Sequence, residues 1–441
     1  MLSNTFHSPT FKVFGIALLA LLMLIPLGQV QGLIGERSAL RATATNAIAE
    51  GWGGAQELGG AVLAVPHTIR VQTAAGWVTQ EVVEIILPDE LTVDATMQPD
   101  ERHYGIYKTP VYTAEVKVSG KFLPADMATL PDAESYLWQR AELRIPIFDV
   151  HGIRRISDMH LDGGDRAFTP SENVVAGIGA VAVPFDLSNG VGEVHEFRFD
   201  MTLAGTESLH IAPLARRTAV HIAAPWPHPT FNGMFLPANR RVDTSGFDAT
   251  WQVLDLNRRF GQHWREGNER QADINAAAFG VALYQPAGIY QQNDRAGKYG
   301  ILFIALTFVA FFLFEVLKKL RVHPVQYLLI GLALATFYVV LLALSEQIGF
   351  TWAYVAAGLS VVLIVSGYAT AILHTWRAGV VLGAMMTFVY AMLYGLIVSE
   401  QHSLLMGAIA LLATVATLMH LTRKVDWYSA TAAVAPAFAH Q

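Results

Sequence analysis

Six stretches of roughly 20 apolar residues predict membrane-spanning helices, because a helix needs about 20 such residues to cross the hydrocarbon core of a bilayer. The stretches cover residues 11–30, 299–317, 327–344, 351–373, 378–398 and 403–421. In the first stretch Lys12 precedes the apolar run, as in a signal peptide, but the run is long and no clear cleavage site follows it. We therefore expect an uncleaved anchor within residues 1–33 and a five-helix bundle within 299–424, followed by a tail at 425–441.

Lysine and arginine in the short links and at the two ends of the chain agree on one orientation of the six stretches. Short loops rich in these residues stay in the cytoplasm. Basic residues occur at the start of the first stretch, in the links at 318–326 and 374–377, and after the last stretch: Lys12, Lys318, Lys319, Arg321, Arg377, Arg423 and Lys424. The links at 345–350 and 399–402 contain none. Both termini are therefore expected in the cytoplasm, and residues 34–298 are expected outside it, in the periplasm.

Residues 34–298 show a different pattern, with a helix predicted at 36–50 and then a period of two that is typical of strands. Ten short segments with alternating or β-branched apolar residues are bounded by Gly, Pro, Asp and Asn: 61–66, 80–87, 114–122, 141–148, 177–185, 194–203, 208–213, 218–223, 247–254 and 278–284. Such spacing predicts a β-sandwich or two β-subdomains, with a further helix at 258–275. The predicted fold class is a polytopic α-helical membrane protein with six transmembrane helices and a large, mainly β, sandwich-like extracytoplasmic domain.

The distribution of charge supports this division and narrows the possible partners. Only 15% of the 441 residues are charged, compared with about 25% in soluble proteins. Residues 34–298 hold 23 of the 30 basic and 32 of the 36 acidic residues, a balance of about −9. This balance argues against nucleic acid as a partner, and leaves the lipid bilayer and an unknown periplasmic protein, membrane protein or envelope component. The absence of cysteine excludes disulfides, thiolate metal sites and cysteine catalysis.

The common catalytic signatures are absent from the sequence. It contains no G-x-S-x-G elbow and no G-x-x-x-x-G-K-[ST] phosphate loop. The pair His195-Glu196 lacks the second histidine of a zinc-protease helix, because the required position is Phe199. We therefore predict that the protein is not an enzyme and uses no cofactor.

The segment from Asp158 to Asp165 is the part of the chain that most resembles a metal site. Asp158, Asp162 and Asp165 lie close to two glycines, as carboxylates do in calcium loops. However, His160 occupies a position that prefers an oxygen ligand, and Thr169 stands where a glutamate would close the loop. We favour a polar turn between two strands, with the three aspartates as the alternative metal ligands.

Three prolines around Trp226, His228 and Phe231 fix the backbone of another unusual segment. The two aromatic side chains could form a rigid interaction platform with His228 beside them. The same rigidity would serve a buried loop that bridges two sheets. We favour this second, structural interpretation.

Charged residues crowd the junction between the outer domain and the second apolar stretch. Arg295 and Lys298 are basic on the outer side of the membrane, against the usual bias. One interpretation is a clamp, in which Arg295 pairs with Asp294 or with an outer-link acid, Glu346 or Glu400, and holds the β-domain on the bundle. Lys298 would then reach lipid phosphate. The other interpretation, which we favour, is simple anchoring in the headgroups.

Several segments, in this order and spacing, resemble one known family. They are Trp226-Pro-His-Pro-Thr-Phe-Asn-Gly, Ser245-Gly-Phe-Asp-Ala-Thr-Trp251, Asp294-Arg-Ala-Gly-Lys298-Tyr299, His323-Pro-Val-Gln-Tyr327, Ser345-Glu346 and Asp426-Trp427-Tyr428-Ser429. The chain is similar over essentially its whole length to the CreD family of bacterial inner-membrane proteins. Gln347 stands where the family pattern has histidine, and Gly60 stands where it has proline, so no role is carried over to those two positions.

The resemblance implies a cellular role but no reaction. CreD-like proteins are associated with cell-envelope integrity, with a two-component system that responds to carbon source or β-lactams, and with altered colicin tolerance. The family has no assigned catalytic residue or cofactor that could be carried over to this sequence.

Three functions remain open. The leading hypothesis is a non-enzymatic inner-membrane protein that supports envelope integrity or the envelope stress response, with a periplasmic β-domain that binds or organises an envelope component. The first alternative is a transporter or lipid-handling channel, although no carboxylate lies mid-span, where coupled transporters keep one. The second is a membrane enzyme acting on envelope glycan or lipid, which a cleft with two or more histidines and carboxylates would favour.

The orientation rule predicts the outcome of reporter fusions. A reporter that is active only in the periplasm should be active when fused near residue 200 and silent when fused after Lys319, Arg377 or Lys424, because basic flanks stay in the cytoplasm. Reporter activity measured in intact cells tests each position. Activity after Lys319 would contradict the arrangement of six spans.

Overall fold

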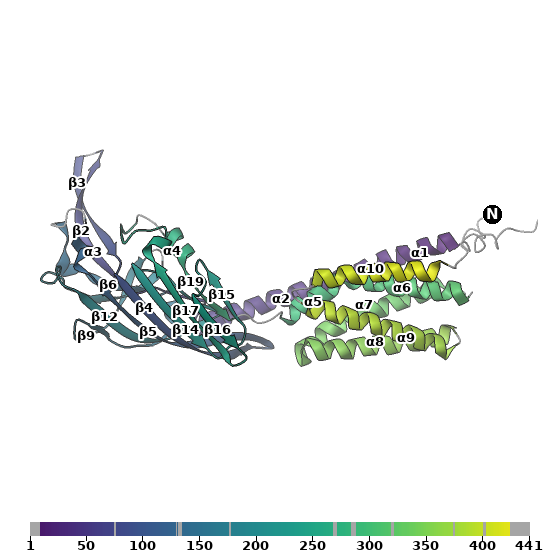
Figure 1. Ribbon diagram of the computed structural model, residues 1–441. Helices are drawn as coiled ribbons and strands as arrows, with labels where there is room; N and C mark the ends of the chain where they lie inside the picture. The colour runs from purple at the N-terminus through teal and green to yellow at the C-terminus, as the bar shows by residue number, and fades with distance from the viewer. Residues whose placement is uncertain are drawn as a thin grey trace, which may run out of the picture. The chain divides into compact units, whose positions relative to one another are not determined.

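The computed structural model of the chain describes residues 9–74, 76–128, 130, 135–175, 178–267, 271–283, 288–318, 322–373, 375–399 and 403–423. The chain divides into a helical unit, Met1–Leu40 with Ala287–Gln441, and a mainly β unit, Arg41–Pro286 (Figure 1). The predicted combination of a membrane protein and a large, mainly β domain is confirmed. The compact β unit is shorter than the predicted 34–298 at both ends.

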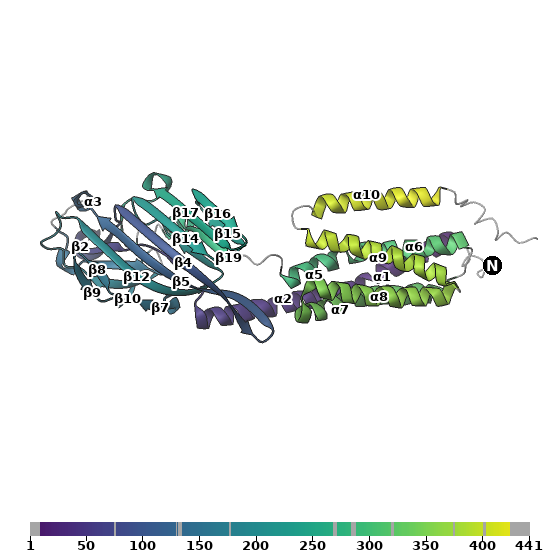
Figure 2. The same ribbon diagram turned by 60° about the horizontal axis from the view of Figure 1, so that its bottom comes forward.

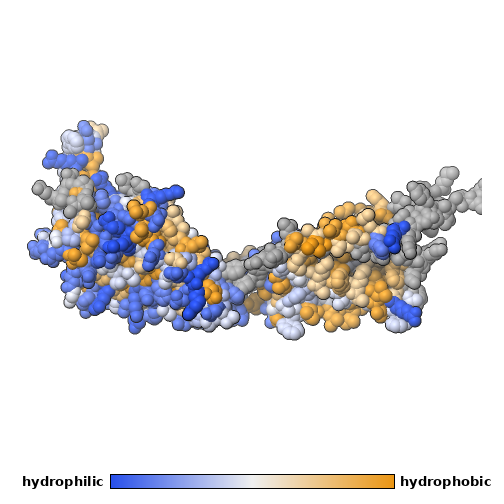
Figure 3. All heavy atoms as spheres, in the orientation of Figure 1, coloured by the Kyte–Doolittle hydropathy of each residue, from blue (hydrophilic) through white to orange (hydrophobic). Residues whose placement is uncertain are grey.

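The helical unit contains the apolar stretches of the sequence. Its helices are α1 (Pro9–Leu22), the first part of α2 (Leu24–Trp52), α5 (Ile289–Lys298), α6 (Gly300–Lys318), α7 (Pro324–Ile348), α8 (Phe350–Leu373), α9 (Trp376–Val398) and α10 (Ser403–Thr422). Figure 3 shows apolar residues over most of the visible surface of these helices and polar residues over most of the β unit. Apolar side chains on the outside of a helical bundle are what a bilayer requires as solvent.

The number of spans is confirmed only in part. Within the described residues, four stretches are long and apolar enough to cross a membrane: Val13–Trp52, Pro324–Ile348, Phe350–Ile372 and Trp376–Val398. A fifth arises if α5 and the first part of α6, which are bent by 44° relative to each other, form one span. Helix α10 covers the sixth apolar stretch but is not among these candidates. Residues 319–321 and the predicted tail at 425–441 lie outside the described residues.

A buried carboxylate joins the end of α6 to the start of α7. Glu315 is 3% exposed, and its carboxylate accepts hydrogen bonds from the backbone N–H of Val322 and the hydroxyl of Tyr327, each at 2.9 Å. Buried carboxylates are stable only when hydrogen bonds of this kind replace water. Glu315 therefore fixes the α6–α7 connection.

Three sheets make up the β unit. The nine-stranded sheet has the order β16 (Asn239–Asp243), β17 (Gly246–Leu254), β14 (Arg217–Ala224), β4 (Glu90–Tyr104), β5 (Tyr107–Phe122), β12 (His195–Thr206), β8 (Met159–Leu161) and β9 (Gly164–Arg166), with β7 (Ile153–Ile156) also paired to β12. The six-stranded sheet has the order β10 (Thr169–Val175), β11 (Ile178–Pro184), β6 (Glu142–Pro146), β2 (Val62–Thr73), β3 (Gly76–Ile86) and β18 (His263–Arg265). The four-stranded sheet has the order β1 (Gln56–Leu58), β13 (Ser208–Ile211), β19 (Phe279–Leu283) and β15 (Pro229–Gly233).

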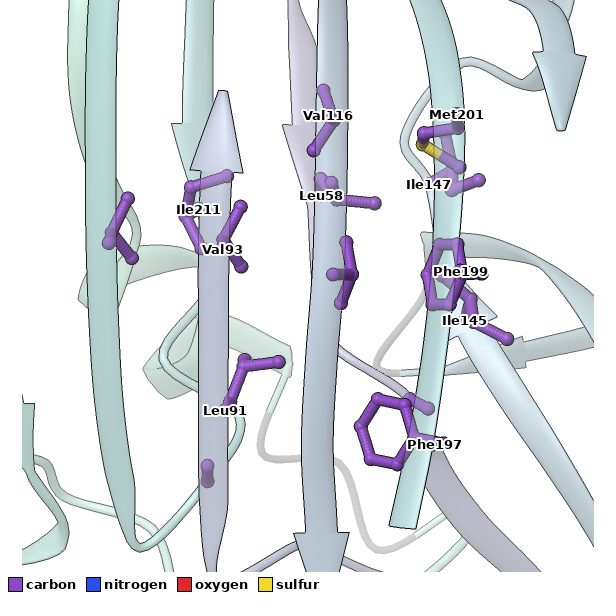
Figure 4. Close-up of a cluster of buried hydrophobic side chains, with 14 of the residues drawn as sticks. Leu58, Leu91, Val93, Val116, Ile145, Ile147, Phe197, Phe199, Met201 and Ile211 are labelled. Carbon is purple, nitrogen blue, oxygen red and sulfur yellow. The ribbon is translucent and has the colours of Figure 1, made fainter. Parts of the chain in front are cut away.

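The main core lies between the nine-stranded sheet and the two smaller sheets. Figure 4 shows Val93 and Val116 of the large sheet with Leu58 and Ile211 of the four-stranded sheet and Ile145 of the six-stranded sheet. Each of these side chains is at most 1% exposed, and full burial of such a side chain stabilises a fold by about 1.5–3 kcal/mol. The predicted sandwich-like packing is therefore present.

All ten predicted strand segments form strands. The structure also contains strands that the sequence did not predict, and the longest of these is β4. Strand β4 alternates buried Leu91, Val93 and Ala95 with polar residues, yet it also contains aspartates and a proline, which are poor strand formers. Its place between β5 and β14 overrides that weak propensity. The predicted helix at 258–275 is wrong: this segment supplies β18, which pairs with β3, and only the short helix α4 (Gln271–Ala277).

A glycine in β5 tests the tight packing of the sheet against the core. A Cβ atom at Gly120 would lie 2.5 Å from Cζ of Phe197 and would also overlap the carbonyl oxygen of Glu90, whereas Gly192 has open space around it. We expect Gly120→Ala to lower the free energy of unfolding by about 1–3 kcal/mol, as overpacked cores do, and Gly192→Ala to leave it nearly unchanged. Thermal unfolding of the purified chain measures both. Equal midpoints for the two variants would show that this contact relaxes without cost.

Candidate functional site

An open cleft of about 660 Å³ lies on the nine-stranded sheet, where β4, β5 and β12 meet the β8–β9 hairpin. Its polar lining consists of Glu90, Thr92, Ser119, Lys121, His160, Asp162, Glu193, Glu196 and Arg198. Successive side chains of a strand point to opposite faces. Since Leu91, Val93 and Phe197 point into the core, the neighbouring polar residues must line the opposite, solvent-facing side. The volume falls in the range of small-molecule sites, about 300–1,000 Å³.

The cleft carries charges of both signs with an excess of carboxylates. Lys121 Nζ lies 2.8 Å from Glu90 Oε2, and both side chains remain partly exposed. Glu193, Glu196 and Arg198 lie on the same lining. This arrangement offers many hydrogen-bond donors and acceptors and little apolar surface, which suits a polar ligand such as a glycan or a peptide.

The predicted turn from Asp158 to Asp165 forms one wall of the cleft. Asp162 and Gly163 have positive φ angles of 50° and 83°, which a two-residue type I′ hairpin turn requires. Across this hairpin His160 Nδ1 lies 2.8 Å from Asp165 Oδ1. Within the described residues no three His, Asp or Glu side chains are placed to hold a metal ion. Of the three aspartates, Asp162 lies in the turn, Asp165 lies in β9 and Asp158 directly precedes β8.

Asp162 also locks the hairpin to β12 through a buried histidine. Its Oδ2 lies 2.6 Å from Nδ1 of His195, and its Oδ1 accepts a hydrogen bond from the backbone N–H of Glu196. The other ring nitrogen, Nε2, lies 2.8 Å from the carbonyl oxygen of Gly190. Both ring nitrogens therefore face an oxygen atom at hydrogen-bond distance. His195 is 4% exposed and thus holds the cleft wall in place without a free nitrogen for chemistry.

The sequence did not reveal the other members of this cleft. Glu90 and Thr92 belong to β4, which was not predicted, and Lys121 and Arg198 were simply exposed positions of predicted strands. Strand order alone brings them together, because β4 lies between β14 and β5 and β12 lies beyond β5. The one signal available was the density of Asp and Gly near Asp162, which marked the hairpin.

A second cluster of polar side chains forms a row across the four-stranded sheet. The register pairs Glu57 with His210, and both His210 and Asn232 with Gly280. His210 Nε2 lies 2.8 Å from Asn232 Oδ1, across the glycine that has no side chain. Oε1 of Glu57 is buried without a hydrogen-bond partner in the described residues, and burial raises the pKa of this carboxyl from 4.5 to about 7.

The aromatic residues of the proline-rich segment lie against the main core. Trp226 and Phe231 both pack on it, and the Phe231 ring centroid is 5.7 Å from that of Phe247 and 5.8 Å from that of Trp251. His228 is exposed, and its carbonyl accepts a hydrogen bond from the indole N–H of Trp226. The segment supplies β15, the edge strand of the four-stranded sheet. Trp226 and Phe231 thus make packing contacts within the β unit.

The charged junction residues lie in α5 and contact other helices of the helical unit. Lys298, not Arg295, pairs with Asp294, at 2.6 Å. Arg295 instead lies 3.4 Å from the carbonyl oxygen of Ile397 at the end of α9, where a cation favours the helix dipole. Glu346 accepts a hydrogen bond from Tyr290.

The clamp alternative offered Asp294 as one partner of Arg295, whereas Lys298 forms that pair in the structure. Arg37 lies 3.9 Å from Glu346, so a different arginine occupies the neighbourhood of that acid. Glu400, the other expected partner of Arg295, lies outside the described residues. The physical reason is that α5 turns Arg295 towards the end of α9, while Lys298 lies one helical turn after Asp294.

Comparisons with known proteins identify one family. A family described as Inner membrane protein CreD matches residues 8–428. The Inner membrane protein CreD of Escherichia coli (strain K12) is 33% identical over 427 residues, which cover 96% of this chain and 94% of that protein.

Two solved structures align with this chain at low similarity. An M1 zinc metallopeptidase of Deinococcus radiodurans aligns with 38% of this chain and 39% of its own at 12% identity and a TM-score of 0.22. A second structure of this peptidase covers 81% of this chain and 94% of its own at 11% identity, with the same TM-score. Scores this low carry no inference about fold or activity.

The buried carboxyl of Glu57 predicts a pH-dependent stability. Because its folded-state pKa is raised from 4.5 to about 7, the folded protein holds this proton more tightly than the unfolded chain between these values. Its contribution to stability is therefore present below pH 4.5 and is lost as the pH rises towards 7. Glu57→Gln should be stabilised relative to the wild type by about 1–3 kcal/mol at pH 8, after allowance for partial exposure, and by almost nothing at pH 4.

Denaturant unfolding of the purified chain at the two pH values measures this difference. Glu115→Gln is a matched control, because Glu115 is 54% exposed on the surface of β5. A gain for Glu57→Gln that is the same at pH 4 and pH 8 would show that the carboxyl does not titrate in this window.

Proposed function

The chain belongs to the CreD family of inner membrane proteins, and from this premise we propose that it supports cell-envelope integrity without catalysing a reaction. In this proposal the β unit binds or organises an envelope component in the periplasm, and the helical unit holds it at the membrane. Family membership supports the membrane location. The large β unit with its own core supports a binding role outside the bilayer.

The proposed topology has six spans, with α10 as the last, both termini in the cytoplasm and residues 34–298 in the periplasm. The basic links and flanks support this orientation. The four candidate spans and the bent α5–α6 pair support five of the six crossings. The α10 segment, 20 residues of mostly apolar composition, supplies the sixth.

The single observation that carries the binding role is the polar cleft of the nine-stranded sheet. It is preformed, because the Asp162–His195 lock fixes its hairpin wall and the sheet fixes its floor. Its carboxylates outnumber its cations, so an anionic component would be repelled, and the component bound there is uncharged and rich in hydrogen-bonding groups, as a glycan or an uncharged peptide is.

The alternatives have weaker support. Coupled transporters keep an ionisable group along their path, and Glu315 is already engaged by Val322 and Tyr327 at the end of α6. The cleft does bring His160 and His195 near carboxylates, which would favour an enzyme of glycan or lipid. Each of these histidines, however, has a carboxylate as its partner, and His195 uses both ring nitrogens.

Charge reversal in the cleft tests the proposal. We expect Arg198→Glu to abolish most of the protection that the protein gives to cells challenged with detergent or β-lactam, because losing a charged hydrogen bond of about 1.5–3 kcal/mol weakens binding about ten- to hundredfold. Survival of a deletion strain that carries the variant measures this. Arg241→Glu is the matched control, since Arg241 is an exposed arginine on the edge strand β16. Equal survival with the two variants at equal expression would show that the cleft is not the binding site.

A further inference from the structure

The polar cleft is one end of a longer row of side chains that crosses the solvent-facing side of the nine-stranded sheet. The strand registers place one residue from each of six neighbouring strands in this row: Gln252 of β17, Ala219 of β14, Thr92 of β4, Ser119 of β5, Arg198 of β12 and His160 of β8. Figure 2 shows β14, β4, β5 and β12 side by side. All six side chains are exposed or partly exposed. Because neighbouring strands lie about 4.8 Å apart, the row is about 24 Å long.

The middle of this row is lower than the rows on either side of it. Ala219, Thr92 and Ser119 have short side chains, whereas the residues two positions before and after them on the same strands are long and charged or titratable. These longer side chains form two walls, one of Arg217, Glu90, Lys121 and Glu196, and the other of His221, Asp94, Lys117 and Asp200. A row of short side chains between two rows of long ones forms a trough across the strands.

Ion pairs hold the walls away from the floor of the trough on β14. The Arg217 guanidinium lies 2.6 Å from a carboxylate oxygen of Asp89, which directly precedes β4. The His221 ring lies 3.1 Å from Asp248, in a row beyond the second wall. Both side chains thus point away from Ala219, which lies between them on the strand. The trough therefore remains open beyond the cleft, whose lining ends at β4.

The chemistry of the trough suits a sugar chain better than a peptide. Its walls pair cations with carboxylates, as in the contacts of Glu90 with Lys121 and Arg217, each at 2.8 Å. Its floor offers hydroxyl, amide and guanidinium groups and no large apolar side chain. Extended peptides are usually bound by an open strand edge or by apolar pockets, but this trough lies over strands that are paired on both sides. An uncharged glycan needs only the hydrogen bonds that these side chains offer.

We propose that the trough binds a linear, uncharged glycan several sugars long, which lies across the strands with one end in the cleft. This inference rests on the proposed function, in which the cleft binds an envelope component, and it names the chemical class of that component. A short oligosaccharide occupies the cleft alone. A longer one also reaches Ala219 and Gln252, so the affinity of the protein rises with the length of the chain.

Two alanines of β14 allow a matched test of the trough beyond the cleft. Ala219 and Ala223 are both half-buried on the same face of the strand, but Ala223 lies in the row of Thr96, outside the trough. Ala219→Tyr fills the floor without touching the cleft lining, and Ala223→Tyr adds the same bulk elsewhere. Calorimetry with the purified full chain measures the binding of disaccharides and hexasaccharides of glucose and of N-acetylglucosamine.

We expect the hexasaccharide of at least one series to bind about tenfold more tightly than its disaccharide, because one or two further hydrogen bonds are formed. Ala219→Tyr should reduce the affinity for the hexasaccharide to that for the disaccharide and leave the disaccharide unaffected. Ala223→Tyr should bind both as the wild type does. Arg198→Glu, within the cleft, should weaken the binding of both lengths.

The contrary outcomes separate this inference from the proposed function. Equal affinity for the two lengths, with loss of both in Arg198→Glu, would show that the cleft binds sugar without the trough and would overturn this inference alone. Equal effects of Ala219→Tyr and Ala223→Tyr would also overturn it, as would the absence of binding in both series. Binding of a peptide of serine and glutamine in place of the sugars, lost in Ala219→Tyr, would assign the trough to a peptide. The survival assay with Arg198→Glu decides the proposed function in every case.

Discussion

Alternation of side chains along the nine-stranded sheet constrains the β unit more than any other feature. Leu91, Val93 and Ala95 of β4 must face the smaller sheets, because only that side excludes water. Glu90 and Thr92 are then forced onto the opposite face, where β5, β12 and the β8–β9 hairpin surround them. The core and the cleft are therefore two sides of the same strands. A shift of register by one residue would destroy both.

Buried polar groups in this protein stabilise connections between elements. His195 with Asp162 holds a hairpin to β12, and Glu315 joins two helices. Asn293, 1% exposed in α5, donates to the hydroxyl of Ser345 at the end of α7. Such groups are costly to bury unless each finds its partner, so they specify one arrangement of the elements. The same residue types in a sequence could equally suggest catalysis or proton transfer.

The charged junction illustrates how tertiary contacts redistribute expected roles. The sequence favours headgroup anchoring by Arg295 and Lys298, and it offers as the alternative a clamp in which Arg295 pairs with an acid. Helix α5 instead presents Arg295 to the end of α9 and leaves Lys298 to pair with Asp294. A helix that follows the β unit thus makes its polar contacts with α7 and α9 inside the helical unit.

The sequence by itself determined the membrane class, the family, ten strand segments and the turn at Asp162. These features depend on local composition, on a period of two and on apolar runs as long as a bilayer is thick, all of which are visible in one segment at a time. Only the tertiary structure decided that residues 90–104 form a central strand, that the segment before α4 adds β18 instead of a helix, and that the cleft exists. Each of these features depends on which distant strands become neighbours. Strand pairing and burial override weak local propensity, and the residues of one segment do not specify which other segment pairs with it.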